Sequence, residues 1–515
     1  MKPIRLIAGF LTVGVWTLAS RVLGFVRDIL IAAQLGAGPV AEAFLIAFSL
    51  PNMFRRFFAE GAFNTAFVPM FSKKLEAGED AADFARDALA GLASIVIGVT
   101  LVALIAMPWL VVAMAGGFVG DDRFDLTVLY GRIAFPYILF ISLAALVSGV
   151  LNATGRFAAA AAAPVVLNLM FIAAMTLAVS LGRDVGDALI WTVPFAGIAQ
   201  LALVWVAAAR AGFRLVPRRP RLTPELKRLA IIAAPAALAG GVVQVNLLVG
   251  RQVASFFDGA IAWLSYADRL YQLPLGVVGI AIGVVLLPDL SRRLRAEDHG
   301  GGRDAFNRAA EFSLALTLPA AVALIVIPAP LVSVLFQRGA FDAADAQATA
   351  LAVAVYGAGL PAFVMQKVLQ PLYFAREDTV SPFRFALVAL VVNAVLAIGL
   401  APLIGYIAAA IGTTLAGWAM VFLLWRGARG MGDAGRFDDR FRKRLPGILA
   451  ASATMGAVLL GATFLMADWL QTPTLRYGAL ALLVGIGGLA YFAAGPIFGG
   501  FRLSEFRRAL RGRGA

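Results

Sequence analysis

The sequence predicts an all-α polytopic membrane protein of about 14 transmembrane helices, arranged as two pseudo-symmetric six-helix bundles plus a C-terminal helix pair. Hydrophobic residues make up 61% of the 515-residue chain and charged residues only 14%, whereas soluble domains carry about 45–50% and about 25%. The apolar residues come in continuous blocks of roughly 20, enough for a helix to cross about 30 Å of hydrocarbon. Because these blocks do not alternate with polar residues, an outer-membrane barrel is excluded.

The apolar blocks define the predicted elements in chain order. Residues 1–5 and the block that follows look like a signal peptide, but the apolar pattern continues past Arg21 to Leu35, which favours a first membrane helix over a cleaved leader. The predicted spans are 8–35, 41–70, 88–115, 126–152, 160–182, 187–209, 228–255, 260–289, 308–329, 347–374, 383–402, 405–426, 447–467 and 476–498.

A repeat divides the chain into two halves. Pro69–Leu75 resembles Pro288–Leu294, and Tyr130-Gly131 parallels Tyr356-Gly357, at an offset of about 220 residues. Each half holds six spans, an even number, so both halves insert with the same orientation. The predicted domains are two six-helix bundles, residues 1–215 and 225–430, followed by an extra hairpin with a basic tail, residues 445–515.

The distribution of basic residues predicts the orientation. The net charge is +14, and Lys and Arg gather in the segments 210–228 and 426–444 and in the tail. Basic loops stay in the cytoplasm. An even number of spans then places both termini inside, and this topology explains the basic charge without a nucleic-acid partner.

Several kinds of chemistry are not expected of this chain. It has no cysteine, and its one histidine, His299, lies in a Gly-rich polar segment, so neither a disulfide framework nor a His-based metal site is predicted. No phosphate-binding Walker pattern is present, which argues against ATP hydrolysis. Asn246 and Asn393 fit helix–helix hydrogen bonds better than ion ligands. The sequence thus predicts no enzyme activity, no metal and no cofactor.

Positive charges inside the apolar blocks are the strongest functional signal. A centrally placed Arg in a membrane helix costs about 2.5–3.5 kcal/mol, so such residues normally face a cavity or a partner. A cluster of them predicts a cationic chamber and an anionic cargo. The residues are Arg21, Arg27, Arg55, Arg56, Arg251, Arg269 and Lys367.

The segment Ser20–Asp28 carries two of these arginines. At 3.6 residues per turn, Arg21 and Asp28 share one helix face, while Arg27 points about 120° away from Arg21. One arginine can therefore face the chamber while the other pairs with a carboxylate or a neighbouring helix. The alternative for Arg27 is that it only snorkels to the membrane interface.

Two further segments contribute one arginine from each half. In the first half, the spacing of Arg56 and Glu60 allows an ion pair, which leaves Arg55 for the cargo. In the second half, Arg269 follows Asp268, and a purely structural Asp268–Arg269 linkage is the alternative. Arginine suits this task because its planar fork binds phosphate oxygens in pairs. Weaker candidates are Glu42, Arg251, Lys367, Gln366 and Gln370.

Three motifs resemble signatures of the bacterial MurJ (MviN) lipid II flippase family, of the multidrug/oligosaccharidyl-lipid/polysaccharide (MOP) exporter superfamily. They are Ser20–Asp28, Leu50–Asn52 with Ala59–Phe63, and Tyr266–Leu270. The resemblance covers essentially the whole chain. It implies substrate binding by Arg21, Arg27, Arg55 and Arg269, with supporting roles for Asp28, Glu42, Arg56, Glu60 and Asp268. The family often has Asp at the position of Glu42.

The resemblance also implies a function. It is the alternating-access transfer of an undecaprenyl-diphosphate-linked peptidoglycan precursor, lipid II, from the inner to the outer leaflet of the cell inner membrane, for cell wall synthesis. We expect a monomer that contacts membrane lipids and the cell-wall synthesis machinery. The energy source is left open between the membrane potential and a monovalent cation. The alternatives are a MATE-like drug or oligosaccharide-lipid exporter, a membrane glycosyltransferase or diphosphatase, and a structural scaffold.

Overall fold

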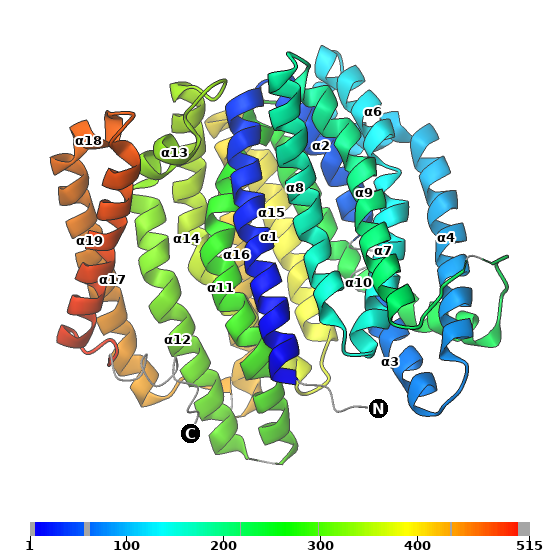
Figure 1. The fold of residues 1–515 in the computed structure, drawn as a ribbon. Helices are drawn as coiled ribbons and strands as arrows, with labels where there is room; N and C mark the ends of the chain where they lie inside the picture. The colour runs from blue at the N-terminus through cyan, green and yellow to red at the C-terminus, as the bar shows by residue number, and fades with distance from the viewer. Residues whose placement is uncertain (1–5, 56–61, 217, 297, 433–434, 503–515) are drawn as a thin grey trace. The chain divides into compact units, whose positions relative to one another are not determined.

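The computed structural model describes residues 6–55, 62–216, 218–296, 298–432 and 435–502, and these ranges are helical apart from short connections (Figure 1). Within them no β-strand forms, and one isolated bridge joins Arg338 to Phe341. In the same ranges, ten helices are long and apolar enough to cross a membrane. The chain is therefore a polytopic α-helical membrane protein, as predicted.

The helices divide into two compact units, Met1–Ala262 and Trp263–Ala515. In the first unit, α1 packs on α8, α2 on α6, and α9 on both α7 and α8. The elements of this unit are α1 (Leu6–Leu35), α2 (Pro39–Arg55), α3 (Ala62–Glu76), α4 (Ala81–Ile105), α5 (Met107–Ala115), the 3₁₀ helix η2 (Gly116–Phe118), α6 (Asp122–Ala134), α7 (Tyr137–Ala153), α8 (Phe157–Ser180), α9 (Val185–Arg210) and α10 (Pro224–Ala254).

In the second unit, α16 packs on both α14 and α15, and α12 packs on α14. Helix α11 (Ala260–Arg295) crosses the boundary between the units in sequence. The other elements are α12 (His299–Val326), α13 (Pro328–Phe336), α14 (Ala343–Phe374), α15 (Val380–Ile404), α16 (Ile407–Ala428), the 3₁₀ helix η3 (Arg429–Met431), α17 (Asp439–Leu465), α18 (Ala467–Gln471) and α19 (Arg476–Ile497).

Two predicted spans are each divided into two helices, and proline lies at both divisions. The span 88–115 breaks at Ala106, next to Pro108, and the span 126–152 breaks at Phe135 and Pro136. Proline has no N–H to continue the helical hydrogen bonds, so it begins a new helix readily. The break between α4 and α5 recurs between α12 and α13, where Pro328 follows Ile327. The two breaks, at Ala106 and Ile327, are separated by about the offset of the sequence repeat.

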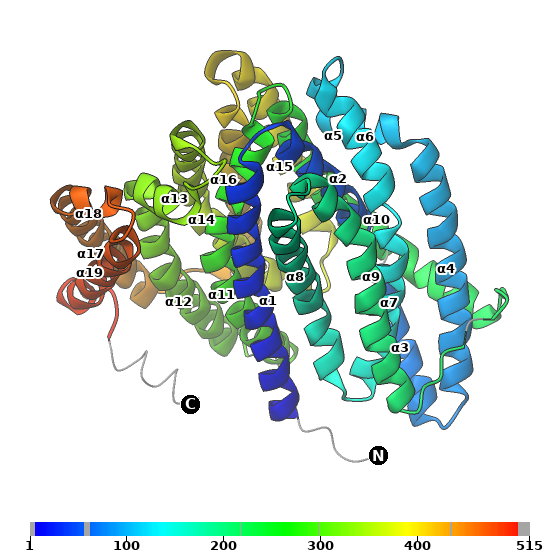
Figure 2. The same ribbon diagram turned by 45° about the horizontal axis from the view of Figure 1, so that its top comes forward.

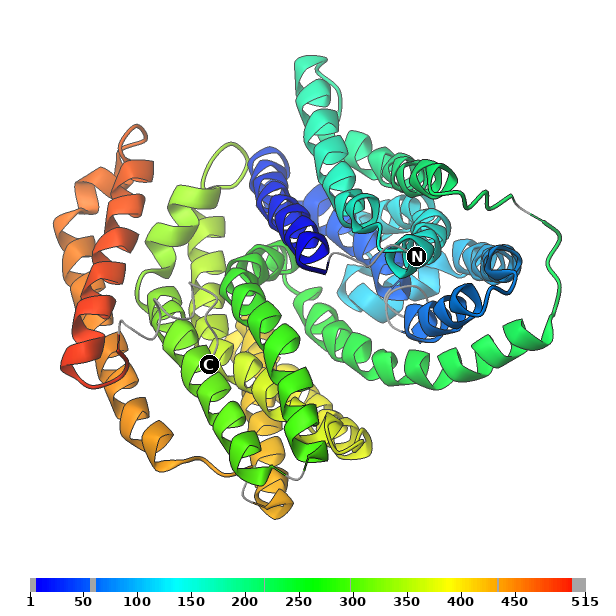
Figure 3. The ribbon, with the colours of Figure 1, turned by 60° about the horizontal axis from the view of Figure 1, so that its bottom comes forward.

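The packing of helix α10 could not be inferred from the sequence repeat. The repeat makes it the first helix of the second half, yet it packs within the first unit against α3, α4 and α5. Figure 3 shows its curved course after the segment that follows α9. The domain ranges 1–215, 225–430 and 445–515 stay predictions.

The last helices form a hairpin that packs on α12 through an apolar layer (Figures 1 and 2). Met455 and Leu459 of α17, Leu483 of α19 and Ala315 of α12 belong to one buried cluster. The Tyr491 hydroxyl donates to the Ala315 carbonyl oxygen at 2.5 Å. Gly456 faces Val322 so closely that a Cβ would lie 2.7 Å from its Cγ1, and small residues of this kind allow membrane helices to approach.

Candidate functional site

Arg27 of α1 is buried and bound on two sides. Its Nε and Nη2 donate to Asp28 Oδ1 at 3.0 and 2.7 Å, and its Nη1 donates to Asn168 Oδ1 of α8 at 2.9 Å. Its guanidinium also lies over the Phe171 ring, 5.6 Å from the centroid. Because Arg27 is only 7% exposed, it does not snorkel. It joins α1 to α8 instead.

Asn168 also links α8 to α1 through a second hydrogen bond, nearer the start of α1. Its Nδ2 donates to the Ser20 carbonyl oxygen at 3.0 Å while its Oδ1 accepts from Arg27. Arg21, between these two contacts in sequence, is exposed and forms no ion pair within the described ranges. The two arginines of the motif therefore differ. Arg27 is paired with a carboxylate and with a neighbouring helix, whereas the side chain of Arg21 is exposed.

The α1–α8 link gives a stability prediction. Asn168→Leu removes the acceptor of Arg27 Nη1 and leaves a buried charged donor unsatisfied, so we expect a loss of about 1–3 kcal/mol in the free energy of unfolding. Thermal unfolding in detergent measures it. Asn152→Leu, the same change at an exposed position of α7, is the control. Equal unfolding temperatures for the two variants would contradict the link.

The second arginine motif is only partly described. Arg55 is half-buried at the end of α2, where the adjacent Phe54 packs edge-on against Phe135 at 5.3 Å between centroids. Arg56 and Glu60, and with them the predicted ion pair, lie outside the described residues.

Glu42, in the first turn of α2, centres a second buried network. It is 1% exposed. Its Oε2 accepts from Arg123 Nη1 at 2.9 Å and its Oε1 from the Ile261 backbone N–H at 3.1 Å. Both carboxylate oxygens are thus occupied in this state, and Glu42 connects α2 with α6 and with the start of α11.

Arg123 holds this network together through three carboxylates. Besides Glu42 it contacts Asp121 at 2.6 Å and Asp258 at 3.0 Å, and it lies over the Phe118 ring at 4.5 Å. Hydrogen bonds from the Arg123 side chain hold the pKa of Asp121 below its ordinary value. Asp121 therefore stays ionised at neutral pH, and its contribution to stability is lost only as the pH falls through that lowered pKa.

A double-mutant cycle tests the Glu42–Arg123 pair. Glu42→Gln and Arg123→Gln should each destabilise the fold, and the double variant should be less destabilised than the sum, with a coupling of about 1–3 kcal/mol. Additive effects on the thermal unfolding of the four proteins would show that the pair contributes nothing.

In the second unit, the packing of α11 leaves Arg269 on an exposed face. Tyr266 packs against Phe336 and Phe341 with centroids 5.6 and 5.5 Å apart, and Tyr271 packs against Tyr356 at 5.1 Å. Arg269, which lies between these two tyrosines in the sequence, is exposed. The preceding Asp268 accepts a hydrogen bond from Gln272 Nε2, one turn further on.

Among the weaker candidates, Gln366 has a structural contact that argues against cargo binding, as Glu42 does. Gln366 Nε2 of α14 donates to the Gly417 carbonyl oxygen of α16 at 3.1 Å. Lys367 is exposed on α14, and Gln370 and Arg251 are half-buried.

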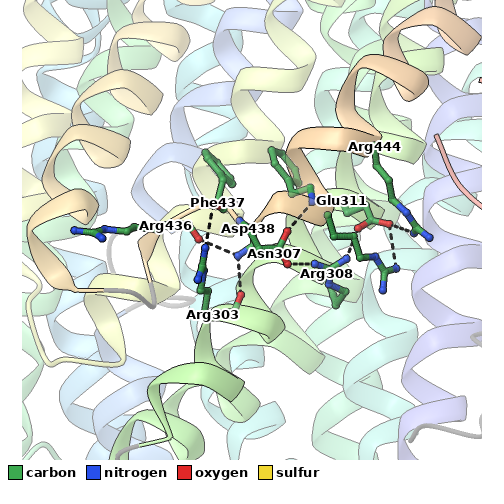
Figure 4. Close-up of polar contacts among 10 residues, drawn as sticks. Arg303, Asn307, Arg308, Glu311, Arg436, Phe437, Asp438 and Arg444 are labelled. Atoms are coloured by element: carbon green, nitrogen blue, oxygen red, sulfur yellow. Dashed lines mark hydrogen bonds and ion pairs between the residues drawn. The ribbon is translucent and has the colours of Figure 1, made fainter. Parts of the chain in front are cut away.

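A third charged network joins α12 to α17 (Figure 4). Glu311 is 6% exposed and pairs with Arg308 at 2.5 Å, with Arg440 at 3.3 Å and with Arg444. Asp438, the N-cap of α17, accepts from the Phe441 N–H at 2.6 Å and also pairs with Arg308.

A fully buried amide completes this junction. Asn307 Nδ2 donates to the Arg436 carbonyl oxygen at 3.0 Å, and its Oδ1 accepts from the Asp438 N–H at 3.0 Å. The network therefore links the start of the C-terminal hairpin to α12 within the second unit.

Sequence reasoning did not identify Asn168, Arg123 or Glu311 as partners of charged groups. For Glu311 a local signal existed, because Arg308 lies three residues before it on the same helix. The contacts of Arg123 with Glu42 and of Asn168 with Arg27 carry no comparable signal, since these partners are 81 and 141 residues apart in sequence.

Comparison with known proteins was made by family, by sequence and by structure. A family model described as "Lipid II flippase MurJ" matches residues 31–479. A "Probable lipid II flippase MurJ" of Rhizobium meliloti (strain 1021) is 45% identical over 99% of this chain and 97% of the relative. A protein of the same description from Vibrio cholerae is 34% identical over 98% of each chain.

Solved structures show the same likeness. "Lipid II flippase MurJ, inward closed conformation" is similar with a TM-score of 0.79 and 25% identity, over 94% of this chain and 98% of that one. An inward-facing multidrug resistance MATE family transporter of the MOP superfamily has a TM-score of 0.66 at 14% identity, over 80% of this chain and 95% of that one. The second likeness shows the fold alone.

Proposed function

The chain belongs to the lipid II flippase MurJ family, and from this premise we propose how this lipid II flippase moves its cargo across the bacterial inner membrane. The cargo is the undecaprenyl-diphosphate-linked precursor, and it passes from the inner to the outer leaflet. The protein works by alternating access, and the polyprenyl tail stays in lipid while the polar head crosses in water.

The diphosphate is the group that the protein recognises. The observation that carries this proposal is that each unit exposes an arginine on a long helix that lies in a predicted span, Arg21 on α1 and Arg269 on α11. Arginines inside membrane spans typically mark a substrate pathway, and a diphosphate offers several oxygens to a guanidinium fork. Arg55 at the end of α2 adds a third charge.

Arg27 has a different part in this proposal from Arg21, Arg55 and Arg269. Its guanidinium already binds Asp28 and Asn168, so in this state it fixes the position of α1, and Asp28 supports it. Binding of cargo by Arg27 would require these bonds to open. Glu42 supports the site indirectly through α2.

The proposal includes the number of membrane spans and the side of the membrane on which the termini lie. Fourteen spans, with both termini in the cytoplasm, fit the distribution of basic loops. The protein acts as a monomer without a cofactor, in contact with membrane lipids and with the cell-wall synthesis machinery. Its energy comes from the membrane potential, about 2.3 kcal/mol per charge per 100 mV, or from a monovalent cation.

Depletion of the protein tests this function. Labelled lipid II should accumulate on the cytoplasmic leaflet and become inaccessible to a reagent added outside, and re-expression of the chain should restore access within one round of synthesis. Unchanged outer-leaflet access after depletion would contradict the flippase assignment. Appearance of released phosphate or of a new glycan bond in a purified system would indicate an enzyme instead.

A further inference from the structure

Two arginines meet around one tyrosine where α13 ends and α19 begins, at the α18 end of the hairpin (Figure 1). The Cζ atom of Arg338 lies 5.7 Å from the centroid of the Tyr477 ring, and that of Arg476 lies 5.1 Å from the same centroid. Both arginines are half-buried, and Tyr477 is half-exposed.

All hydrogen-bond acceptors of these two arginines are neutral. Arg338 Nη2 donates to the carbonyl oxygens of Val334 and Leu335 at 2.8 and 2.5 Å. Arg476 donates from Nη1 to the Gln337 carbonyl oxygen and from Nη2 to the Tyr477 hydroxyl, both at 3.2 Å. The Nε atoms of both side chains are buried without a hydrogen-bond partner.

The charge of this pair is therefore not compensated locally. In the described part of the chain, no carboxylate forms an ion pair with either guanidinium, whereas Arg27, Arg123, Arg218 and Arg444 each have an acid within contact. Two like charges at the same ring repel each other, and a bound anion would relieve this repulsion. The first turn of α19, which begins at Arg476, has no side-chain cap and adds to the positive potential.

The surroundings of the pair indicate where an anion would come from. Trp469 and Leu475 are 53% and 50% exposed, and Phe464 and Leu465 are 84% and 85% exposed. Exposed aromatic side chains next to arginines are typical of the level of lipid headgroups. A phosphate group is the anion found at this level, and arginine binds it through paired hydrogen bonds.

We propose that Arg338 and Arg476, which both lie against Tyr477, form a binding site for a phosphate group, separate from the cargo-binding arginines. Nη1 of Arg338, which forms no hydrogen bond in the described part of the chain, is the donor available to it, and the positive charges of both guanidinium groups add to the attraction. The phosphate is carried by a phospholipid headgroup or is free in solution, and the two sources are distinguished by the choice of probe.

The test uses the purified full-length chain in detergent. Native mass spectrometry measures the binding of phosphatidylglycerol and of a diacylglycerol with the same acyl chains and no phosphate, and calorimetry measures the binding of inorganic phosphate. Arg476→Gln keeps a neutral donor for the Gln337 carbonyl but removes the charge. Arg183→Gln, at an exposed arginine between α8 and α9, removes a charge elsewhere and is the matched control.

We expect Arg476→Gln to weaken phosphatidylglycerol binding about tenfold, the effect of one charge-assisted hydrogen bond, and Arg183→Gln and the diacylglycerol to show no such effect. The same loss seen with inorganic phosphate and not with the lipid would identify a site for free phosphate. If neither probe separates Arg476→Gln from Arg183→Gln, the site does not exist.

A charge-retaining variant covers the case in which Arg476→Gln unfolds. Arg476→Lys keeps the positive charge without the guanidinium fork, so it should bind phosphate more tightly than Arg338→Gln and more weakly than the unmodified chain. A folded Arg476→Lys protein that binds no better than Arg338→Gln would overturn the proposal, because the charge would then have no effect.

Discussion

Arg269→Ala is expected to reduce lipid II transport by roughly ten- to a hundredfold while leaving membrane insertion intact. The side chain is exposed on α11, and the ring contacts of Tyr266 and Tyr271 hold the helix in the second unit. A charge-assisted hydrogen bond to the diphosphate contributes about 1.5–3 kcal/mol, and each 1.4 kcal/mol corresponds to a factor of about ten. Accessibility of labelled lipid II in the outer leaflet measures the effect.

The same helix supplies the control for this experiment. Arg292 is an exposed arginine near the end of α11 that pairs with Asp289 at 2.9 Å. Arg292→Ala removes the same charge from the same helix, and transport should remain near the normal rate. Normal transport by Arg269→Ala would remove this residue from the mechanism, and equal losses in both variants would indicate a general effect of charge.

Glu311→Gln is expected to lower the free energy of unfolding by about 2–4 kcal/mol, the range for breaking a buried ion pair after allowance for the exposure of its partners. The substitution removes the carboxylate shared by Arg308, Arg440 and Arg444, while Arg308 keeps its contact with Asp438. Their repulsion acts between α12 and the first turn of α17. The hairpin should therefore detach at this end first.

Two measurements on one pair of variants test this expectation. Thermal unfolding reports the overall loss, and limited proteolysis reports whether the segment before α17 becomes cleavable. Asp304→Asn changes an exposed acid on the same helix and should leave both readouts unchanged. A Glu311→Gln protein as stable and as protease-resistant as Asp304→Asn would mean that the network does not fasten the hairpin.

The helical class and the position of most elements could be predicted from the sequence, because lipid requires about 20 apolar residues per span whatever the fold. The divisions at Ala106 and Phe135 could have been placed more accurately from the neighbouring prolines. The packing of α10 within the first unit could not have been predicted, since a repeat indicates insertion direction but not which neighbours a helix contacts.

The candidate site was predictable in its residue types but not in its pairings. A charge in an apolar block is visible in the sequence, which is how Arg21, Arg27, Arg55 and Arg269 were selected. Whether a guanidinium is exposed or bound depends on side chains far away in sequence. Asn168 binds Arg27 and Arg123 binds Glu42 only because α8 and α6 fold against α1 and α2.

The contacts between α12 and the hairpin of α17 and α19 limit how such a chain can evolve or be shortened. Helix α12 contacts the hairpin and the segment before it through Ala315, Glu311 and Asn307. If residues 435–502 were deleted, Ala315 would meet lipid, and Glu311 and Asn307 would keep only their partners within α12. A version of this chain that lacks the hairpin is therefore not obtained by truncation alone. It would need a rewritten α12, and natural loss of the terminal pair should be accompanied by changes at these positions.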